Sequence, residues 1–255
     1  MSGGWIGKSG APGNVKQSGV FSLDEVNEAK ARKAWYDPGA LKQIADLLRW
    51  YNASQITGLA DNDPVSQWDD LSSNANHATQ ATSANRPLYK TNIANGNPVL
   101  RFDGSDDGLE FSKILDSSGS VGHMFVVAKG NSAGGIISTR NGGTGWSYRY
   151  TGTTTTQYYH TGSSPNISYT VANQLNILEV RRNGLTVALG ANGTLGSATA
   201  ISGYTASAMA ATYIGYEEGS YLSCDIAEIA IYSRLLTADE RAIVLAHLKM
   251  KYAIA

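Results

Sequence analysis

Short apolar segments alternate with clusters of glycine, asparagine, aspartate and serine along most of the chain after residue 45. The segments are rich in β-branched and aromatic residues, and they read LLRWYNAS, PVLRFDG, HMFVVAKG, GIISTR, WSYRYTG, LNILEVRR, LTVALG, TYIGY and CDIAEIAIY. Recurrent short strands without helical periods between them are typical of two packed antiparallel sheets, not of a βαβ fold. The pattern therefore predicts an all-β fold built as a two-sheet antiparallel sandwich.

Alternation within these segments indicates which side chains face the core. In PVLRFDG, Leu100 and Phe102 are expected to point inward, while Arg101 points outward or pairs with an acidic residue. Trp50 and Trp68 are expected in the core because large aromatic side chains bury the most apolar surface.

A single helix is predicted at the C-terminal end of the sandwich. Thr237 and Glu240 form a capping box in TADE, and an apolar stripe follows at Val244, Leu248 and Tyr252. Such a stripe indicates a helix that packs on the sandwich and covers part of it.

The first 36 residues differ from the rest of the chain. Residues 1–19 are rich in glycine and serine, and Ser22 and Glu25 then form a capping box that opens a short helix ending near Trp35. A helix of this length is marginal alone, so it is expected to dock on a partner or on the domain that follows. The sequence therefore predicts an arm over residues 1–36 and a sandwich domain over residues 37–255.

Composition excludes several classes of partner. The chain has 255 residues, of which 42% are hydrophobic and 16% charged, and its net charge is −1. Such a balance offers no electrostatic surface for nucleic acid or an anionic membrane, and no apolar run approaches the roughly 20 residues of a membrane span. A single cysteine, Cys224, and an N-terminus without an apolar stretch predict a protein without disulfides that is made in the cytosol and not exported by the Sec pathway.

No pair of acidic residues has the spacing expected of a glycosidase. Retaining glycosidases need two carboxyl groups about 5 to 5.5 Å apart. Asp225 and Glu228 are three residues apart and should point to opposite faces of a strand, and the adjacent Glu217 and Glu218 should do so if their segment is extended. Residues 61 and 63 are both aspartate, but they belong to a loop. The histidines also lack zinc-site spacing, so we expect a protein that is not an enzyme.

The segment FDGSDDGLEF concentrates three carboxylates, those of Asp103, Asp106 and Asp107, between two aromatic residues. Repeated aspartate and glycine favour a turn between two strands. The alternative is a calcium site, because three neighbouring carboxylates repel one another unless a hard cation binds them. A catalytic role is the third reading, and the least favoured.

Aromatic residues mark two candidate positions for a ligand. In WSYRY, the residues Trp146, Tyr148 and Tyr150 share one face of a strand, where they form either the core or a platform for a sugar ring, with the core favoured. The segment TGTTTTQYYHTGSSPN that follows is expected to be an exposed loop, which would offer Tyr158, Tyr159 and His160 to a carbohydrate or to another subunit.

Several segments together resemble a known family. In order and spacing, LRWYNAS, VSQWDD, RPLYKTNIANGNPVLRFDGSDDGLEF and CDIAEIAIYSRLLTADERAIVLAHLKMKY are similar to the laminin-G-like, concanavalin A-like jelly rolls of bacteriophage and bacterial surface proteins, over residues 45–254. The arm segment SGVFSLDEVNEAKARKAW is similar to N-terminal segments of phage virion and tail-fibre proteins. The resemblance implies a jelly roll, and many members of the family bind calcium at the rim of the sandwich.

The resemblance also implies a function, which we state as an expectation. The chain is expected to be a non-enzymatic virion protein that attaches the particle to host-surface polysaccharide, while residues 1–36 bind other virion proteins. Display in several copies, with a homotrimer favoured, would raise the avidity of a weak sugar site. A structural protein that decorates or cements the capsid or tail is the alternative, and a polysaccharide-degrading spike is a third reading.

Overall fold

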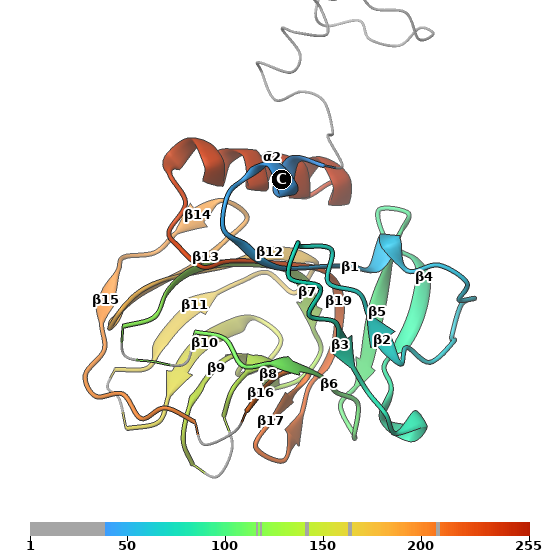
Figure 1. Cartoon of the computed structure of the whole chain (residues 1–255), viewed down its shortest axis with the longest axis horizontal. Helices are drawn as coiled ribbons and strands as arrows, with labels where there is room; N and C mark the ends of the chain where they lie inside the picture. Colours follow the sequence, from blue (N-terminus) through green and yellow to red (C-terminus); the bar gives the residue numbers. More distant parts are fainter. Residues whose placement is uncertain (1–38, 116, 118, 141–142, 163–164, 208–209) are drawn as a thin grey trace, which may run out of the picture. The chain divides into compact units, whose positions relative to one another are not determined.

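The computed structural model describes residues 39–255, apart from residues 116, 118, 141–142, 163–164 and 208–209. The predicted arm of residues 1–36, including its helix, lies outside the described residues. Two large antiparallel sheets face each other in the described part, with one helix packed on the outside (Figure 1). The two-sheet antiparallel sandwich predicted from the sequence is confirmed.

One sheet has nine strands and carries the longest of them. Its hydrogen-bonded order is β14 (Thr194–Leu195), β13 (Thr186–Ala191), β12 (Asn176–Asn183), β7 (Val121–Gly130), β19 (Ser223–Tyr232), β5 (Asn97–Asp103) and β4 (Leu88–Ala94). Two further strands extend it, because β1 (Leu47–Asn52) pairs with β19 and β15 (Thr199–Ala200) pairs with β13.

The opposite sheet has eight strands. Its order is β11 (Ile167–Thr170), β10 (Thr155–His160), β9 (Trp146–Tyr150), β8 (Gly134–Ser138), β16 (Ala211–Ile214), β6 (Leu109–Ser112), β3 (Ala78–Thr79) and β2 (Gln67–Trp68). A separate hairpin of β17 (Tyr216–Glu217) and β18 (Ser220–Tyr221) lies beside β8, and short 3₁₀ turns occur at Ala40–Gln43, Ala53–Gln55 and Ser83–Asn85.

The main core fills the space between the sheets. Leu100 and Phe102 from the nine-stranded sheet pack there with Trp68 and Tyr148 from the opposite sheet, and all four are fully buried. Arg101, between two inward-facing residues, points to the other side of β5. The alternation predicted for this segment is therefore confirmed.

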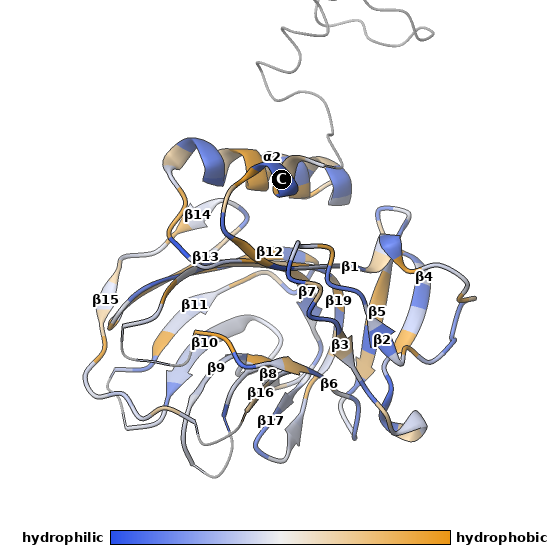
Figure 2. Ribbon diagram, in the orientation of Figure 1, coloured by the Kyte–Doolittle hydropathy of each residue, from blue (hydrophilic) through white to orange (hydrophobic). Residues whose placement is uncertain are grey.

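Helix α2 (Ala238–Tyr252) covers the outer face of the nine-stranded sheet (Figure 1). The capping box predicted at Thr237 and Glu240 is present, and Val244, Leu248 and Tyr252 are buried in a second apolar cluster formed with the strands. Hydrophobic and hydrophilic stretches alternate along α2 in Figure 2, as expected for a helix with one packed face. Among the described residues, no helix is long and apolar enough to cross a membrane.

A β-bulge in β19 changes the direction of one acidic side chain. The register of β19 on β7 shifts between Ile226 and Glu228, which adds one residue to the strand. As a result, Asp225 and Glu228 both lie on the outer side of the nine-stranded sheet, and the prediction that they point to opposite faces is wrong. Asp225 pairs with Arg101 at 2.7 Å, and Glu228 pairs with Lys251 of α2 at 2.7 Å.

Candidate functional site

The aromatic residues of β9 belong to the core. Trp146, Tyr148 and Tyr150 are at most 1% exposed and pack between the sheets. The preference for the core over a sugar platform is therefore confirmed. A ligand outside the sandwich does not reach these rings. Their assignment as candidate carbohydrate contacts is therefore wrong, and they are core residues.

The segment that contains Tyr158, Tyr159 and His160 is a strand, and the prediction of an exposed loop is wrong. It forms β10, which pairs with β9 on one side and β11 on the other. Tyr158 and His160 are 2% and 1% exposed, whereas Tyr159 alternates to the outer face of the sheet and is partly exposed. The run of threonines in this segment, residues 153–156, favours a strand, because β-branched residues favour extended backbone. Of these three candidates, only Tyr159 lies on an accessible surface.

Tyr159 is the centre of a polar cluster on the outer face of the eight-stranded sheet. The guanidinium carbons of Arg140 and Arg149 each lie 4.4 Å from the centre of its ring, within the range of a cation–π contact. Glu217 Oε1 accepts hydrogen bonds from Arg140 at 2.9 Å and from Arg149 at 3.3 Å. We call this set the arginine cluster, and its members are Arg140, Arg149, Gln157, Tyr159, Glu217 and Glu218.

The remaining bonds of the arginine cluster fix both guanidinium groups. Arg149 donates from Nε and Nη2 to the amide oxygen of Gln157, at 3.1 and 2.7 Å. Arg140 pairs with Glu218 at 2.7 Å as well as with Glu217. Two cations thus face two carboxylates, so the cluster carries no net charge.

Glu217 and Glu218 converge on one arginine because the backbone between them is not extended. Glu218 has a φ of +46° and the following Gly219 has a φ of +82°, which makes the tight turn between β17 and β18. The condition for opposite faces, an extended segment, is therefore not met, and both carboxylates reach Arg140. Each carboxylate is held by a guanidinium group, and Glu217 is only 4% exposed. Both carboxylates of the pair are thus engaged in ion pairs.

A row of cross-strand neighbours connects the arginine cluster to the rest of the outer face. From β10 to β6, the directly paired residues are Tyr159, Ser147, Ser138, Tyr213 and Glu110. Two small serines lie between two tyrosines in this row. The hydroxyl of Ser147 is buried and has no hydrogen-bond partner among the described residues. Such an unpaired buried hydroxyl is uncommon, and because Ser138 and Ser147 are both fully buried, neither serine is accessible to a ligand on the outer face.

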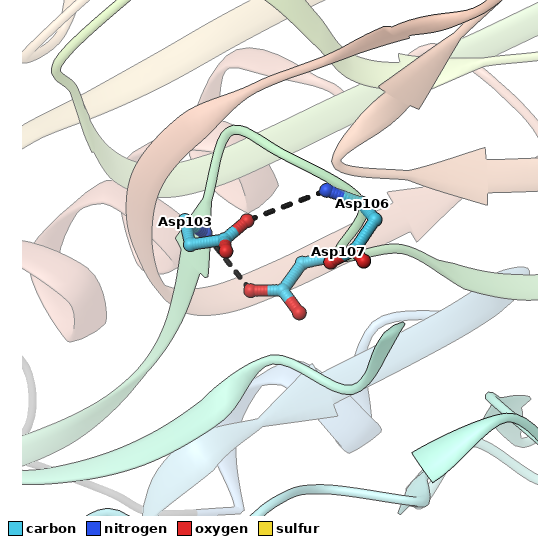
Figure 3. A group of neighbouring side chains, drawn as sticks. All are labelled: Asp103, Asp106 and Asp107. Carbon is cyan, nitrogen blue, oxygen red and sulfur yellow. Dashed lines mark hydrogen bonds between the residues drawn. The ribbon is translucent and has the colours of Figure 1, made fainter. Parts of the chain in front are cut away.

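Of the three aspartates of FDGSDDGLEF, Asp103 ends β5, and Asp106 and Asp107 lie in the connection to β6 (Figure 3). Asp103 Oδ1 accepts hydrogen bonds from the backbone N–H groups of Ser105 at 2.7 Å and Asp106 at 3.5 Å. Asp107 Oδ2 accepts from the N–H group of Asp103 at 2.9 Å, which closes the loop. Gly104 has a φ of +84°, a conformation that favours glycine. The turn predicted from the sequence is present.

The same loop has the donor set of a hard cation site. One carboxylate oxygen from each of Asp103, Asp106 and Asp107 lies within 4.8 Å of the other two. Asp107 is 5% exposed, and its burial, followed by the charges of Asp103 and Asp106, raises its pKa to about 6. Oxygen donors of this kind suit calcium, which would neutralise the repulsion that raises this pKa. The residues therefore fit calcium, and calcium binding stays a prediction.

Sequence reasoning missed the arginine cluster. Glu217 lies 77 residues from Arg140 and 68 residues from Arg149 in the sequence, so no local motif joins the hairpin to the two arginines. The one signal was the Glu-Glu-Gly-Ser turn between Tyr216 and Tyr221, which indicates a hairpin. The position of that hairpin over β8 depends on tertiary structure.

Comparison with protein-family profiles and with curated protein sequences finds no match. Among solved structures, Trypanosoma rangeli sialidase in complex with sialic acid is similar, with a TM-score of 0.59 and 13% identity over 89% of this chain and 40% of that chain. The binding domain of botulinum neurotoxin serotype D has a TM-score of 0.58 and 12% identity over 81% of this chain and 52% of that chain. The binding domain of Paraclostridial Mosquitocidal Protein 1 has a TM-score of 0.57 and 13% identity over 80% and 52% of the two chains.

These neighbours establish the fold. At 12–13% identity, the similarity concerns the β-sandwich alone. The chain spans about 40–52% of the length of these three neighbours. One further neighbour is the binding domain of botulinum neurotoxin DC in complex with SialylT.

Proposed function

We propose that this chain is a non-enzymatic carbohydrate-binding protein of a bacteriophage virion, which attaches the particle to polysaccharide on the host surface. The sandwich domain binds the carbohydrate through the outer face of its eight-stranded sheet. Support comes from the polar and aromatic side chains of that face and from a fold shared with proteins whose structures hold sialic acid or SialylT. The laminin-G-like resemblance of residues 45–254 supports the same class.

The observation that carries the proposal is the arginine cluster. Its guanidinium, carboxylate and amide groups hold one another in place, and the side chains of Arg140 and Arg149 remain 19% and 25% exposed. Planar groups fixed in this way offer hydrogen-bond donors and acceptors in defined directions, which suits the neighbouring hydroxyls of a sugar. Helix α2 covers the outer face of the nine-stranded sheet, whereas the outer face of the eight-stranded sheet carries the β17–β18 hairpin beside β8.

The assignment to a virion rests on the resemblance of SGVFSLDEVNEAKARKAW to arms of phage virion and tail-fibre proteins. In this proposal, residues 1–36 bind other virion proteins and the sandwich is displayed on the particle surface, with a trimer as the favoured assembly. Particles that carry a chain without residues 1–36 should then lose the sandwich domain, as measured by mass spectrometry of purified particles. Retention of the domain on such particles would contradict the role of the arm.

The absence of catalysis is part of the proposal. The buried carboxylates of Glu179 and Glu228 are ion-paired with Arg241 and Lys251, and those of Glu217 and Glu218 with Arg140. A general acid or a nucleophile needs a carboxyl group free to contact the glycosidic bond, and these four carboxylates are held by their partners. Release of reducing ends from host polysaccharide by the purified chain would contradict this part and would support the degrading spike.

The proposal is tested by binding of the full chain to bacterial cells before and after periodate oxidation of their surface sugars. We expect saturable binding that periodate abolishes, and that Arg149→Met weakens, because this variant removes the contacts with Tyr159, Gln157 and Glu217. Lys249→Met is the matched control, since it removes one positive charge from α2 on the other side of the sandwich. Binding that resists periodate, or no binding to any cell, would favour the structural decoration or cement protein.

A further inference from the structure

Three tyrosines form a continuous, partly exposed aromatic surface next to the arginine cluster. Tyr213 of β16 packs edge-on against Tyr216 of β17 with ring centres 5.2 Å apart, and Tyr216 packs against Tyr221 of β18 at 5.1 Å. Tyr216 and Tyr221 are direct partners in the hairpin, so their side chains share one face. We call Tyr213, Tyr216 and Tyr221 the tyrosine patch.

The hydroxyl groups of the tyrosine patch have no hydrogen-bond partner within the described part of the chain. Other tyrosines of this protein do have one: Tyr51 donates to the carbonyl of Asn76 at 2.6 Å, and Tyr252 donates to Glu228 at 2.8 Å. Burial is the main cause that raises the pKa of Tyr213, followed by the charge of Glu110. The patch therefore combines partly buried rings with three hydroxyl groups that remain free to bond a ligand.

The charged groups that border the tyrosine patch are acidic. Glu110 is the direct cross-strand partner of Tyr213, and its exposed carboxylate has no ion pair or hydrogen bond among the described residues. The aspartate loop of β5 and β6 adjoins the patch on another side, since a Cβ atom on Gly108 would lie 3.5 Å from Cβ of Tyr216. The guanidinium groups of the neighbouring arginine cluster are already paired with Glu217 and Glu218.

We propose that the tyrosine patch, together with Glu110, is a binding site for neutral saccharides. The C–H face of a hexose ring stacks on tyrosine rings, while sugar hydroxyls donate to the Glu110 carboxylate and bond the free tyrosine hydroxyls. An anionic sugar would instead meet the unpaired carboxylate of Glu110 and, without bound calcium, the carboxylates of the aspartate loop. This inference rests on the proposed carbohydrate-binding function and deepens it by naming the site and the class of sugar.

The proposed site therefore differs in ligand from the neighbours of similar fold. The structures of the Trypanosoma rangeli sialidase and of the botulinum neurotoxin DC binding domain hold sialic acid and SialylT, respectively. The charge around the tyrosine patch predicts that this chain prefers neutral hexoses to such sugars.

The test is binding of the full chain to immobilised neutral and sialylated oligosaccharides, measured for the wild type and four variants. Tyr216→Ala and Tyr221→Ala remove the rings, Tyr216→Phe removes one hydroxyl and keeps its ring, and Leu185→Ala removes an exposed apolar side chain from the β12–β13 turn as a matched surface control. Melting temperatures identify any variant that fails to fold. Sedimentation of each variant reports the oligomeric state.

We expect the wild type to bind neutral oligosaccharides in preference to sialylated ones. Each alanine variant should bind about tenfold more weakly, the phenylalanine variant should show a smaller loss, and Leu185→Ala should bind as the wild type does. If both alanine variants bind as strongly as the wild type, the site is overturned and the proposed function stays intact. The same holds if the variants lose binding only because their oligomeric state has changed. Preference for sialylated sugars would overturn the ligand class. No binding of the wild type to any glycan would overturn both proposals.

Discussion

The carboxylate of Glu228 in β19 lies 2.7 Å from the ammonium group of Lys251 in α2, and both side chains are buried. The same carboxylate accepts a hydrogen bond from Trp50 Nε1 at 2.6 Å and one from the hydroxyl of Tyr252 at 2.8 Å. A buried carboxylate with this many partners fixes the helix on the outer face of the nine-stranded sheet. The proposed binding surface lies on the other sheet, away from this helix.

Replacing Glu228 with glutamine should destabilise the domain strongly. The variant keeps the shape of the side chain but leaves the Lys251 ammonium group buried without its counter-charge, at a cost of about 3 kcal/mol in the free energy of unfolding. Urea unfolding followed by fluorescence measures this change. The control is Glu110→Gln on the exposed face, which should change the free energy of unfolding by less than about 0.5 kcal/mol. Equal effects of the two variants would contradict the anchoring role of Glu228.

The stability of the domain should also fall at acidic pH because of Glu228. Burial by itself raises the pKa of this carboxyl, but the hydrogen bond with His247 and the charges of Lys251 and His247 lower it to about 2. Since the unfolded state binds a proton at higher pH than the folded state does, this contribution is present above about pH 4.5 and is lost as the pH falls towards 2.

The measurement is the free energy of unfolding of the wild type and of Glu228→Gln between pH 6 and pH 2.5. The difference between the two proteins should shrink as the pH falls through this range. A difference that stays constant would show that the ionised form of Glu228 is not the source of the stabilisation.

Asp107 should give the opposite pH dependence. Its pKa is raised to about 6, so the folded state holds a proton at pH values where the unfolded state has lost it. Stability from this group is full below about pH 4 and declines as the pH rises to about 6, by roughly 1–3 kcal/mol. Asp107→Asn should remove this decline from the curve of melting temperature against pH, and a curve unchanged by the substitution would contradict the assignment.

Calcium should reverse the loss of stability that Asp107 causes as the pH rises, if the aspartate loop binds it. A ligand that binds only the folded state raises the melting temperature by mass action. Millimolar calcium should therefore raise the melting temperature of the wild type at pH 7, and a chelator should remove the increase. Asp103→Asn and Asp107→Asn should lose the response, whereas Asp61→Asn, in a different loop, should keep it. The same melting temperature with calcium and with chelator would leave the loop as a turn without a metal.

Placement of the β17–β18 hairpin depends on the missing side chain of Gly135. A Cβ atom there would lie 2.7 Å from Cβ of Glu217 and 2.9 Å from the carbonyl oxygen of Tyr216. Gly135→Ala should push the hairpin away from β8, separate Glu217 from both arginines and weaken carbohydrate binding about tenfold or more. Gly152→Ala, where a Cβ atom meets nothing within 4 Å, is the matched control. Equal binding by the two variants would contradict a role for the hairpin in the site.

Local sequence signals predicted the parts of the fold that depend on neighbours in the chain. Leu100 and Phe102 face inward because a strand alternates, and Thr237 caps α2 because its side chain and Glu240 satisfy the first backbone groups of the helix. These effects act over two to four residues, so the sequence alone determines them. The burial of Trp50 and Trp68 follows from their size.

The candidate site was predicted poorly because it depends on register and on contacts distant in sequence. The bulge after Ile226 turns Glu228 to the same side as Asp225, although strict alternation would separate them. Tyr159 was predicted from the sequence as an exposed loop residue, but it lies in a strand. Its contacts with Arg140 and Arg149 arise from the pairing of β8, β9 and β10. No spacing in the sequence carries that information.

The central claim is that the outer face of the eight-stranded sheet binds carbohydrate, and the most direct measurement is equilibrium binding of the full chain to purified host-surface polysaccharide. We predict saturable binding that soluble fragments of the same polysaccharide inhibit, and that both Arg149→Met and Tyr216→Ala weaken while Lys249→Met leaves it unchanged. Binding that all three variants retain equally, or the absence of binding to every polysaccharide of the host, would contradict the account.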